Sequence, residues 1–299
     1  MNSIKNRNTI ITELTCFIPQ KAVILHLIMK NSLLISLVAL IIFFTTGCKS
    51  DFERVRTIGD PAAILTQADT YFEAGEYLKA QTLYELVISS FRGRPEAELI
   101  SYNYAYSYYH MEQFILAGHY FKNFSNTYGA SQYKEEAEFM HAYSNYKLSP
   151  TFRLDQSYSL KAIEALQEFI NIHPSSDRLE ECNKLIDEMR LKLEIKAFEG
   201  AVLYYDLQQY QAAIRSFENI LIEYPDTKQA EEVRFLTVES AFLLAKNSFV
   251  EKQLERYENV IKRGDAFINR YKSSDNAIQV QKMLGDSQKR LKQLDNVRY

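Results

Sequence analysis

The stretch EGAVLYYDLQQYQAAIRSFENILIEYPDT, residues 199–227, decides the fold of this chain. It holds two amphipathic helical segments separated by a short polar turn, and a proline follows the second segment. Ala201 and Ala213 are small enough to let the two helices approach closely, while Tyr204 and Phe217 are placed to fill the groove beside them. These residues predict an antiparallel pair of packed helices.

The same spacing of small and aromatic residues occurs twice more, in Ala68, Tyr71, Ala80 and Tyr84 and in Ala105, Tyr108, Ala117 and Phe121. A landmark also recurs, in which an aromatic residue or His is followed by a turn and an acidic helix start: Phe91, Tyr128, His173, Tyr224 and Tyr271. Successive landmarks are 37, 45, 51 and 47 residues apart. The tetratricopeptide repeat has a period of about 34 residues. We therefore predict an all-α tetratricopeptide-repeat superhelical solenoid of about five helix pairs, some of them extended.

Two irregularities divide the array. Ala142 and Ala162 are 20 residues apart instead of 12, which predicts an eight-residue insertion around residues 148–158, inside the third repeat unit. Residues 178–208 contain no Pro, and their only Gly is Gly200. One helix of roughly 30 residues, about 45 Å long at 1.5 Å per residue, could therefore join two groups of repeat units.

The amino-terminal segment reads as a bacterial lipoprotein signal. Lys30 precedes an apolar run at residues 33–44, which ends in Thr45-Thr46-Gly47-Cys48. Such a run is too short to span a bilayer, which takes roughly 20 apolar residues. We expect residues 1–47 to be removed, with Met29 as the true start, and Cys48 to be acylated at the head of a linker, residues 48–60. The alternative is a buried apolar helix that ends in an incidental cysteine.

Composition argues against several functions. Without residues 1–47, 31 basic and 37 acidic residues give a net charge of −6, so nucleic acid is not expected as a partner. Three cysteines, Cys16, Cys48 and Cys182, form neither a disulfide framework nor a zinc site. There is no phosphate loop, nucleophile motif or helical His pair. Three acidic pairs sit where helices begin and are expected to complement helix dipoles: Glu135-Glu136, Glu180-Glu181 and Glu231-Glu232. No enzymatic activity, cofactor or metal is expected.

Five tyrosines, Tyr102, Tyr104, Tyr106, Tyr108 and Tyr109, fall within eight residues. A helical run of this kind covers nearly every face of the helix, so two interpretations remain open. In one, the rings are ordinary packing, with Tyr108 and either Tyr104 or Tyr106 in the core. In the other, the outward rings line a groove that binds peptides, since exposed tyrosine is favoured at interfaces. The candidates for groove-facing rings are Tyr71, Tyr102 and Tyr106.

Together these features resemble the BamD family, tetratricopeptide-repeat lipoproteins of the machinery that inserts β-barrels into the outer membrane. The matching features are the lipid-bearing Cys48, the extended third repeat unit, the run Ala105-Tyr-Ser-Tyr-Tyr109, and Tyr224-Pro-Asp-Thr227 after the Tyr204-Tyr205 helix. The resemblance covers about residues 48–299. The chain departs from the family in an extra helical stretch near residues 251–264 and in Lys272, where Pro is typical.

The resemblance implies a scaffold that is lipid-anchored in the outer membrane and faces the periplasm. Repeat units one to three, residues 61–175, would bind unfolded barrel substrates. Units four and five, residues 176–299, would bind a BamA-like barrel protein, with Arg234 and Lys246 as interface candidates. One alternative is a repeat lipoprotein that organises cell-wall or division enzymes. Another is a glycan-binding lipoprotein, against which the absence of Trp argues.

Overall fold

The structure, a computed structural model, describes residues 51–297, and Cys16, Cys48 and the apolar run lie outside them. Within that range every regular element is an α-helix, so the predicted all-α class is confirmed. The helices are α2 (Asp51–Thr57), α3 (Pro61–Glu73), α4 (Tyr77–Val87), α5 (Glu96–His110), α6 (Phe114–Thr127), α7 (Lys134–Lys147), α8 (Ser157–Ile172), α9 (Leu179–Asp206), α10 (Tyr210–Glu223), α11 (Ala230–Lys246), α12 (Val250–Arg270) and α13 (Asp275–Val297).

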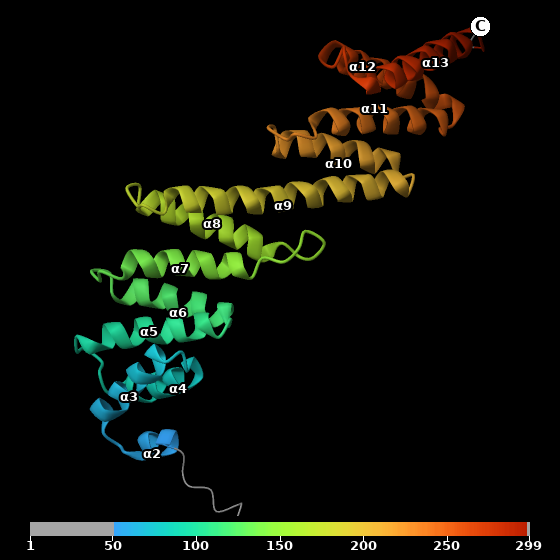
Figure 1. Ribbon diagram of the computed structural model, residues 1–299. Coiled ribbons are helices and arrows are strands. Elements are labelled where there is room, and N and C mark those ends of the chain that lie inside the picture. The colour runs from blue at the N-terminus through green and yellow to red at the C-terminus, as the bar shows by residue number, and fades with distance from the viewer. Residues whose placement is uncertain (1–50, 298–299) are drawn as a thin grey trace, which may run out of the picture. The chain divides into compact units, whose positions relative to one another are not determined.

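The chain divides into two compact parts, residues 1–69 and 70–299. In the first, the structure describes α2 and most of α3, and α2 has no buried residue. In the second, each helix from α4 to α13 packs against the next one along the chain, and α11 also contacts α13. Figure 1 shows these helices as a stack of antiparallel pairs, α5/α6 to α11/α12. We call the first member of each pair helix A and the second helix B.

The predicted landmarks mark the starts of helices. Phe91, Tyr128, His173, Tyr224 and Tyr271 each lie a few residues before α5, α7, α9, α11 and α13. The three acidic pairs lie in the first turns of α7, α9 and α11, as expected of carboxylates beside a helix amino terminus. The insertion in the third unit is the connection between α7 and α8, residues 148–156.

The small residues of the seam are buried as predicted, but one aromatic residue of the pattern is not. Ala117 and Ala213 are fully buried, and Ala213 belongs to a core cluster with Ala201, Phe217, Ile220 and Val233. Tyr204, however, was expected in the groove and is 46% exposed. The cause lies in the preceding repeat unit. Lys196 of α9 bonds the insertion loop, so that unit ends beside residue 196 and leaves Tyr204 uncovered.

Helix α9 confirms the predicted long helix, with 28 residues from Leu179 to Asp206. The first half of α9 packs on α8, and its buried residues are Cys182, Leu185, Ile186 and Met189. Its second half, with the buried Ala201, packs on α10. Between residues 190 and 200 no side chain is fully buried. The helix therefore belongs to two packing layers in succession.

Hydrogen bonds within the insertion loop, residues 148–156, and from α9 fix its conformation. The buried Gln156 donates its Nε2 to the carbonyl oxygens of Thr151 and Leu154, at 2.8 and 3.0 Å. Lys196 Nζ donates to the carbonyl oxygens of Phe152 and Leu154, at 3.2 and 2.7 Å. These bonds satisfy backbone groups that a loop would otherwise leave to water, and they tie the loop to α9.

Three turns between helices share one backbone conformation. Gly75, Glu112 and Gln208 have φ of 76°, 59° and 58°. The residue after each donates its N–H to a carbonyl five residues earlier, the Schellman helix end: Glu76 to Tyr71, Gln113 to Tyr108 and Gln209 to Tyr204. Glycine adopts this conformation without steric cost, whereas a residue with a Cβ is strained.

Replacing Gln208 by Gly should therefore stabilise the protein. Relief of the strain outweighs the added freedom of the unfolded chain, and we expect a gain of about 0.5–1 kcal/mol, measured by chemical denaturation. The matched control is Gln211→Gly, at an exposed position inside α10. There glycine should cost about 1 kcal/mol. Destabilisation of similar size by both variants would contradict the assignment of strain to Gln208.

Candidate protein-binding surfaces

Successive repeat units are joined by a recurring pair of hydrogen bonds. A landmark hydroxyl accepts the backbone N–H two residues later, and it also donates to a carboxylate of the preceding helix A. The hydroxyl and carboxylate pairs are Ser131–Glu98, Ser176–Glu135, Thr227–Glu194 and Ser274–Glu231. Each hydroxyl thus holds the backbone at the start of one helix and fixes it to the previous unit.

The sequence separation within each pair shows which repeat units are longer than the regular ones. The hydroxyl and carboxylate are 33 residues apart in two cases, and 41 and 43 in the units that contain the insertion loop and α12. Glu98, Glu135 and Glu231 lie at the starts of their helices, but Glu194 lies in the middle of α9. The regular helix A of unit four therefore begins near Glu194. The preceding half of α9 closes unit three, as α13 closes unit five.

Thr227→Ala should cost about 1–2 kcal/mol of stability, because it removes both the hydrogen bond to the Gln229 N–H and the bond to Glu194. Thr227 is buried, so water replaces these bonds poorly. Thermal denaturation followed by circular dichroism measures the loss. Thr227→Ser keeps the hydroxyl and should retain most of the stability. Equal losses in the two variants would show that the lost methyl group, not the hydrogen bonds, is responsible.

Half-buried tyrosines form a continuous aromatic surface across the helices A of units two and three. We call this set the tyrosine surface: Tyr102, Tyr106 and Tyr109 of α5, Tyr133 just before α7, and Tyr143 and Tyr146 of α7. Tyr102 stacks on Tyr133 with ring centroids 4.6 Å apart and contacts Tyr106 at 4.9 Å. Farther along the helices, Tyr109 contacts Tyr143 at 6.3 Å, and Tyr143 stacks on Tyr146 at 5.4 Å.

The remaining tyrosines of α5 lie in the core. Tyr104 and Tyr108 are buried, and both rings contact Tyr120 of α6, at 4.7 and 5.0 Å. Their hydroxyls are 3.1 Å apart, and Gln81 of α4 donates to that of Tyr108. The packing interpretation is therefore confirmed for Tyr104 and Tyr108. Tyr102, Tyr106 and Tyr109 are left on a different face.

A carboxylate links the tyrosine surface to the next unit. Glu136 accepts a hydrogen bond from the Tyr106 hydroxyl at 2.8 Å and one from Arg178 at 2.6 Å. The Arg178 guanidinium also lies 4.0 Å from the ring centroid of Phe139. Burial raises the pKa of Tyr106 well above its ordinary value, and the bonds to Tyr102 and Glu136 raise it further. The hydroxyl therefore stays protonated and donates at any physiological pH.

The three groove candidates, Tyr71, Tyr102 and Tyr106, do not all lie on the same surface. Tyr102 and Tyr106 contact each other within the tyrosine surface. Tyr71 is half-buried near the end of α3, where Lys79 Nζ lies 4.9 Å from its ring centroid. Sequence reasoning missed Glu136 and Arg178, because the acidic pair was explained by the helix dipole alone.

A basic groove runs between α10 and α12, the helices B of units four and five. A cavity of about 380 Å³ is lined there by Arg215, Glu218, Lys252, Arg256 and Arg263, among others. A second cavity, of about 270 Å³, shares Glu218 and Arg263 with the first. We call the basic residues that line the two cavities the basic groove: Arg215, Arg234, Lys252, Arg256, Arg263 and Arg270.

The two partner candidates differ in their relation to this groove. Arg234 lines it, and its Nε is a buried donor without a hydrogen-bond partner. Lys246 is exposed at the end of α11 and is absent from the lining of both cavities. Arg263 pairs with Glu218, and Glu255 also lines the larger cavity, so two acids offset part of the basic charge.

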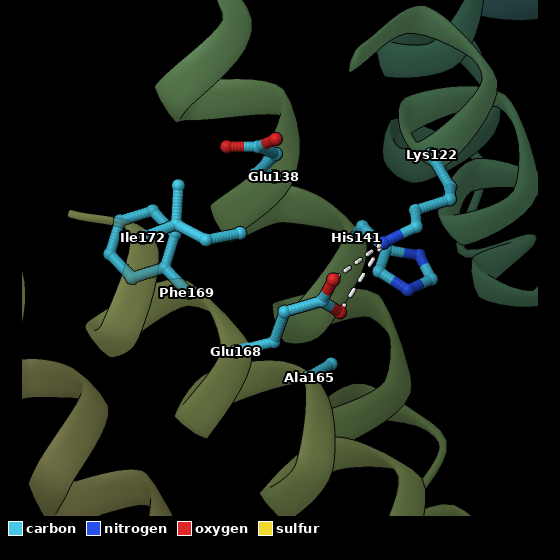
Figure 2. Close-up of a pocket in the computed structure, with 7 residues that line it drawn as sticks. All are labelled: Lys122, Glu138, His141, Ala165, Glu168, Phe169 and Ile172. Carbon is cyan, nitrogen blue, oxygen red and sulfur yellow. Dashed lines mark hydrogen bonds and ion pairs between the residues drawn. The ribbon is translucent and has the colours of Figure 1, made fainter. Parts of the chain in front are cut away.

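Figure 2 shows a small cavity between α6 and α8 over α7. Lys122 Nζ pairs there with both carboxylate oxygens of Glu168, each at 3.3 Å, which bridges helices B of units two and three. His141 Nδ1 is 2.8 Å from the carbonyl oxygen of Gly118, and burial lowers the pKa of His141. The lining includes no Ser, Thr or Cys. The geometry is that of a structural ion pair.

Within residues 51–297, no group of three or more His, Cys, Asp or Glu side chains gathers in a way that could hold a metal ion. No helix in that range combines the length and apolar character required to cross a bilayer.

Comparisons with known proteins place the chain in a family. The family model described as YfiO, outer membrane lipoprotein, matches residues 59–253. The outer membrane protein assembly factor BamD of Rickettsia prowazekii (strain Madrid E) is 24% identical over 236 residues, which cover 78% of this chain and 91% of that protein. Among solved structures, the TPR2AB-domain:pHSP90 complex of yeast Sti1 is 11% identical with a TM-score of 0.36. The match covers 76% of this chain and 98% of that one.

The family match and the relative confirm the resemblance inferred from the sequence. The matched residues extend from the turn before α3 into the first turn of α12, and they include the tyrosine surface and most of the helix pairs. Since the match covers more than half of the sequence, the chain belongs to the YfiO family of outer membrane lipoproteins.

Proposed function

We propose that this protein is a scaffold of the β-barrel assembly machinery, anchored to the outer membrane through acylated Cys48 and facing the periplasm. It would help barrel proteins to fold and insert by binding them and a barrel-shaped partner, without catalysing a reaction. Family membership and the named relative support the general role. The assignment of substrate binding to the tyrosine surface and of partner binding to the basic groove rests on the residues of those two surfaces.

The tyrosine surface is the observation that carries the substrate side of the proposal. A strand of an unfolded barrel protein presents alternating apolar side chains and unpaired backbone groups. Half-buried tyrosine rings can cover the apolar side chains, while their hydroxyls bond the backbone. Tyr102 and Tyr106 are already ordered by Tyr133 and Glu136, so binding costs little loss of side-chain freedom. We assign this role to units one to three, residues 61–175.

The basic groove carries the partner side. In a chain with more acidic than basic residues, six basic side chains on α10, α11 and α12 favour an acidic surface on the partner. We assign this role to residues 176–299, which hold units four and five together with the half of α9 before Glu194, and we propose a BamA-like barrel protein as the partner. The affinity of each surface can be modest, because an acyl anchor confines the protein to the same membrane as its partner.

Photocrosslinking in cells tests the two assignments separately. A photoreactive residue at Tyr71, Tyr102 or Tyr106 should capture unfolded barrel proteins, and one at Arg234 should capture the barrel-shaped partner. Lys246, outside the groove lining, should capture the partner less efficiently than Arg234. The control is Leu116, an exposed residue of α6 in the same unit as Tyr102 and Tyr106.

The outcomes discriminate between the candidate functions. Substrate crosslinks that arise only from residues 176–299 would overturn the division of labour. Capture of only cell-wall or division enzymes from both surfaces would replace the proposal with that of an organiser of those enzymes.

A further inference from the structure

Large apolar side chains protrude where helix A passes into helix B. Figure 1 shows the connections α7–α8, α9–α10 and α11–α12 at the right-hand ends of their helices. Exposed apolar residues occur at each of these connections. We call them together the turn edge: Leu154 in the insertion loop, Leu203 and Leu207 at the end of α9, and Phe249 and Val250 at the start of α12. Phe249 is 83% exposed, the largest fraction among the exposed large apolar residues of the described chain.

The apolar side chains of the turn edge project from the surface and do not line a groove. None of its residues lines a cavity described above. Gly200, one turn before Leu203 on α9, would meet nothing within 4 Å if it carried a Cβ, so this part of the helix is open. A protein partner would need a complementary hollow to take each projecting side chain. A fluid bilayer surface accommodates them without one.

Charge distinguishes this edge from the opposite one. Residues 147–161, 203–210 and 243–252 at the turn edge contain five basic and three acidic residues. At the opposite edge, where helix B passes into the next helix A, residues 134–138, 177–181 and 226–234 contain four basic and nine acidic residues. Anionic phospholipids would repel the second edge and accept the first. Ile222 is 76% exposed, but it lies on the acidic edge.

Lysines flank the most exposed ring. Lys246 and Lys252 lie three residues on either side of Phe249, and both are exposed. A lysine can lie along apolar surface while its ammonium group reaches the phosphate headgroups. An aromatic ring between two such lysines is the arrangement typical of segments that lie at a membrane interface.

We infer that the turn edge of units three to five rests on the surface of an anionic phospholipid bilayer, with Phe249 and Val250 entering the boundary between headgroups and acyl chains. The inference rests on membership of the outer membrane lipoprotein family. It shares Lys252 with the basic groove and Lys246 with the partner candidates, but its apolar residues belong to neither binding surface. Contact at this edge would hold the long axes of the helices away from the membrane plane. It would also leave the acidic edge in solvent.

The absence of Trp from the sequence permits a direct test. The Phe249→Trp variant carries its only indole on the turn edge, and the Ile222→Trp variant carries it at a similarly exposed site on the acidic edge. Each full-length acylated protein is reconstituted in vesicles of phosphatidylethanolamine and phosphatidylglycerol with brominated acyl chains. The indole of the Phe249→Trp variant should lose most of its emission, and its spectrum should shift to the blue. The Ile222→Trp variant should keep both intensity and wavelength.

Three results would overturn the inference. The turn-edge indole could remain unquenched although the protein is bound to the vesicles. Both indoles could be quenched equally, which would show no preference between the edges. The turn-edge spectrum could also shift only after a purified barrel partner is added, which would make this edge a protein-docking site. A weaker response of the Phe249→Trp variant when Lys246→Glu and Lys252→Glu are added would support the assignment to anionic lipid.

Discussion

Cys48→Ser should release the protein from the membrane fraction. Each buried methylene of an acyl chain contributes about 0.8 kcal/mol of membrane binding, and one chain alone binds only marginally. A lipoprotein with two or three chains therefore depends on them entirely for stable attachment. Contacts at the turn edge are too few to replace them. Fractionation after a carbonate wash, with the mass of the amino-terminal peptide, measures the effect.

The control for this prediction is Cys182→Ser. Cys182 is fully buried in α9, and burial raises the pKa of its thiol to about 11, so it remains a protonated core residue. The Cys182 variant should stay in the membrane fraction. If the Cys48 variant also resists the wash, the chain is held by something other than an acyl anchor at that position.

Ala213→Phe should disrupt the seam of unit four. Ala213 is fully buried against Phe217, Ile220 and Val233, and the helices cannot accommodate a ring without moving apart. Overpacking of this kind costs about 1–3 kcal/mol or more. In a repeat array the damage spreads to the neighbouring interfaces, so α9 and α11 should loosen with α10. Urea denaturation followed by circular dichroism is the measurement.

Asn219→Phe provides the matched comparison, since Asn219 is exposed on the same helix. An exposed substitution of this kind should change stability by no more than about 0.5 kcal/mol. Similar behaviour of the two variants would mean that Ala213 does not lie in a tightly packed seam.

The sequence was sufficient to predict the helix pairs, because small residues and aromatic landmarks recur at a spacing that only stacked helices explain. It also located the insertion after α7, from the spacing of Ala142 and Ala162, and the length of α9, from the absence of Pro between residues 178 and 208. The error at Tyr204 has a physical cause. The pattern records which residues face a neighbouring helix, but not how far that neighbour extends.

The contacts between units were less accessible to sequence reasoning. Ser131 and Glu98 are 33 residues apart, and nothing local indicates that the hydroxyl both holds the turn before α7 and reaches α5. Likewise, the position of Arg178 against Glu136 depends on how two successive loops bring α7 and α9 together. The basic groove was not predicted, because its residues come from α10, α11 and α12 and form no basic stretch in the sequence. The assignments of Tyr71, Tyr102, Tyr106, Arg234 and Lys246 to binding surfaces stay predictions.

The double role of α9 has a geometric consequence. Its first half closes one group of helices and its second half begins the next, so the rotation between the two groups is fixed by the number of residues between Met189 and Ala201. One inserted residue would turn everything after it by about 100° and advance it by 1.5 Å. Seven inserted residues would restore the phase to within about 20°. Length changes in this segment therefore leave the relative orientation nearly unchanged only when they are close to a whole number of helical turns, such as about 7, 11 or 18 residues.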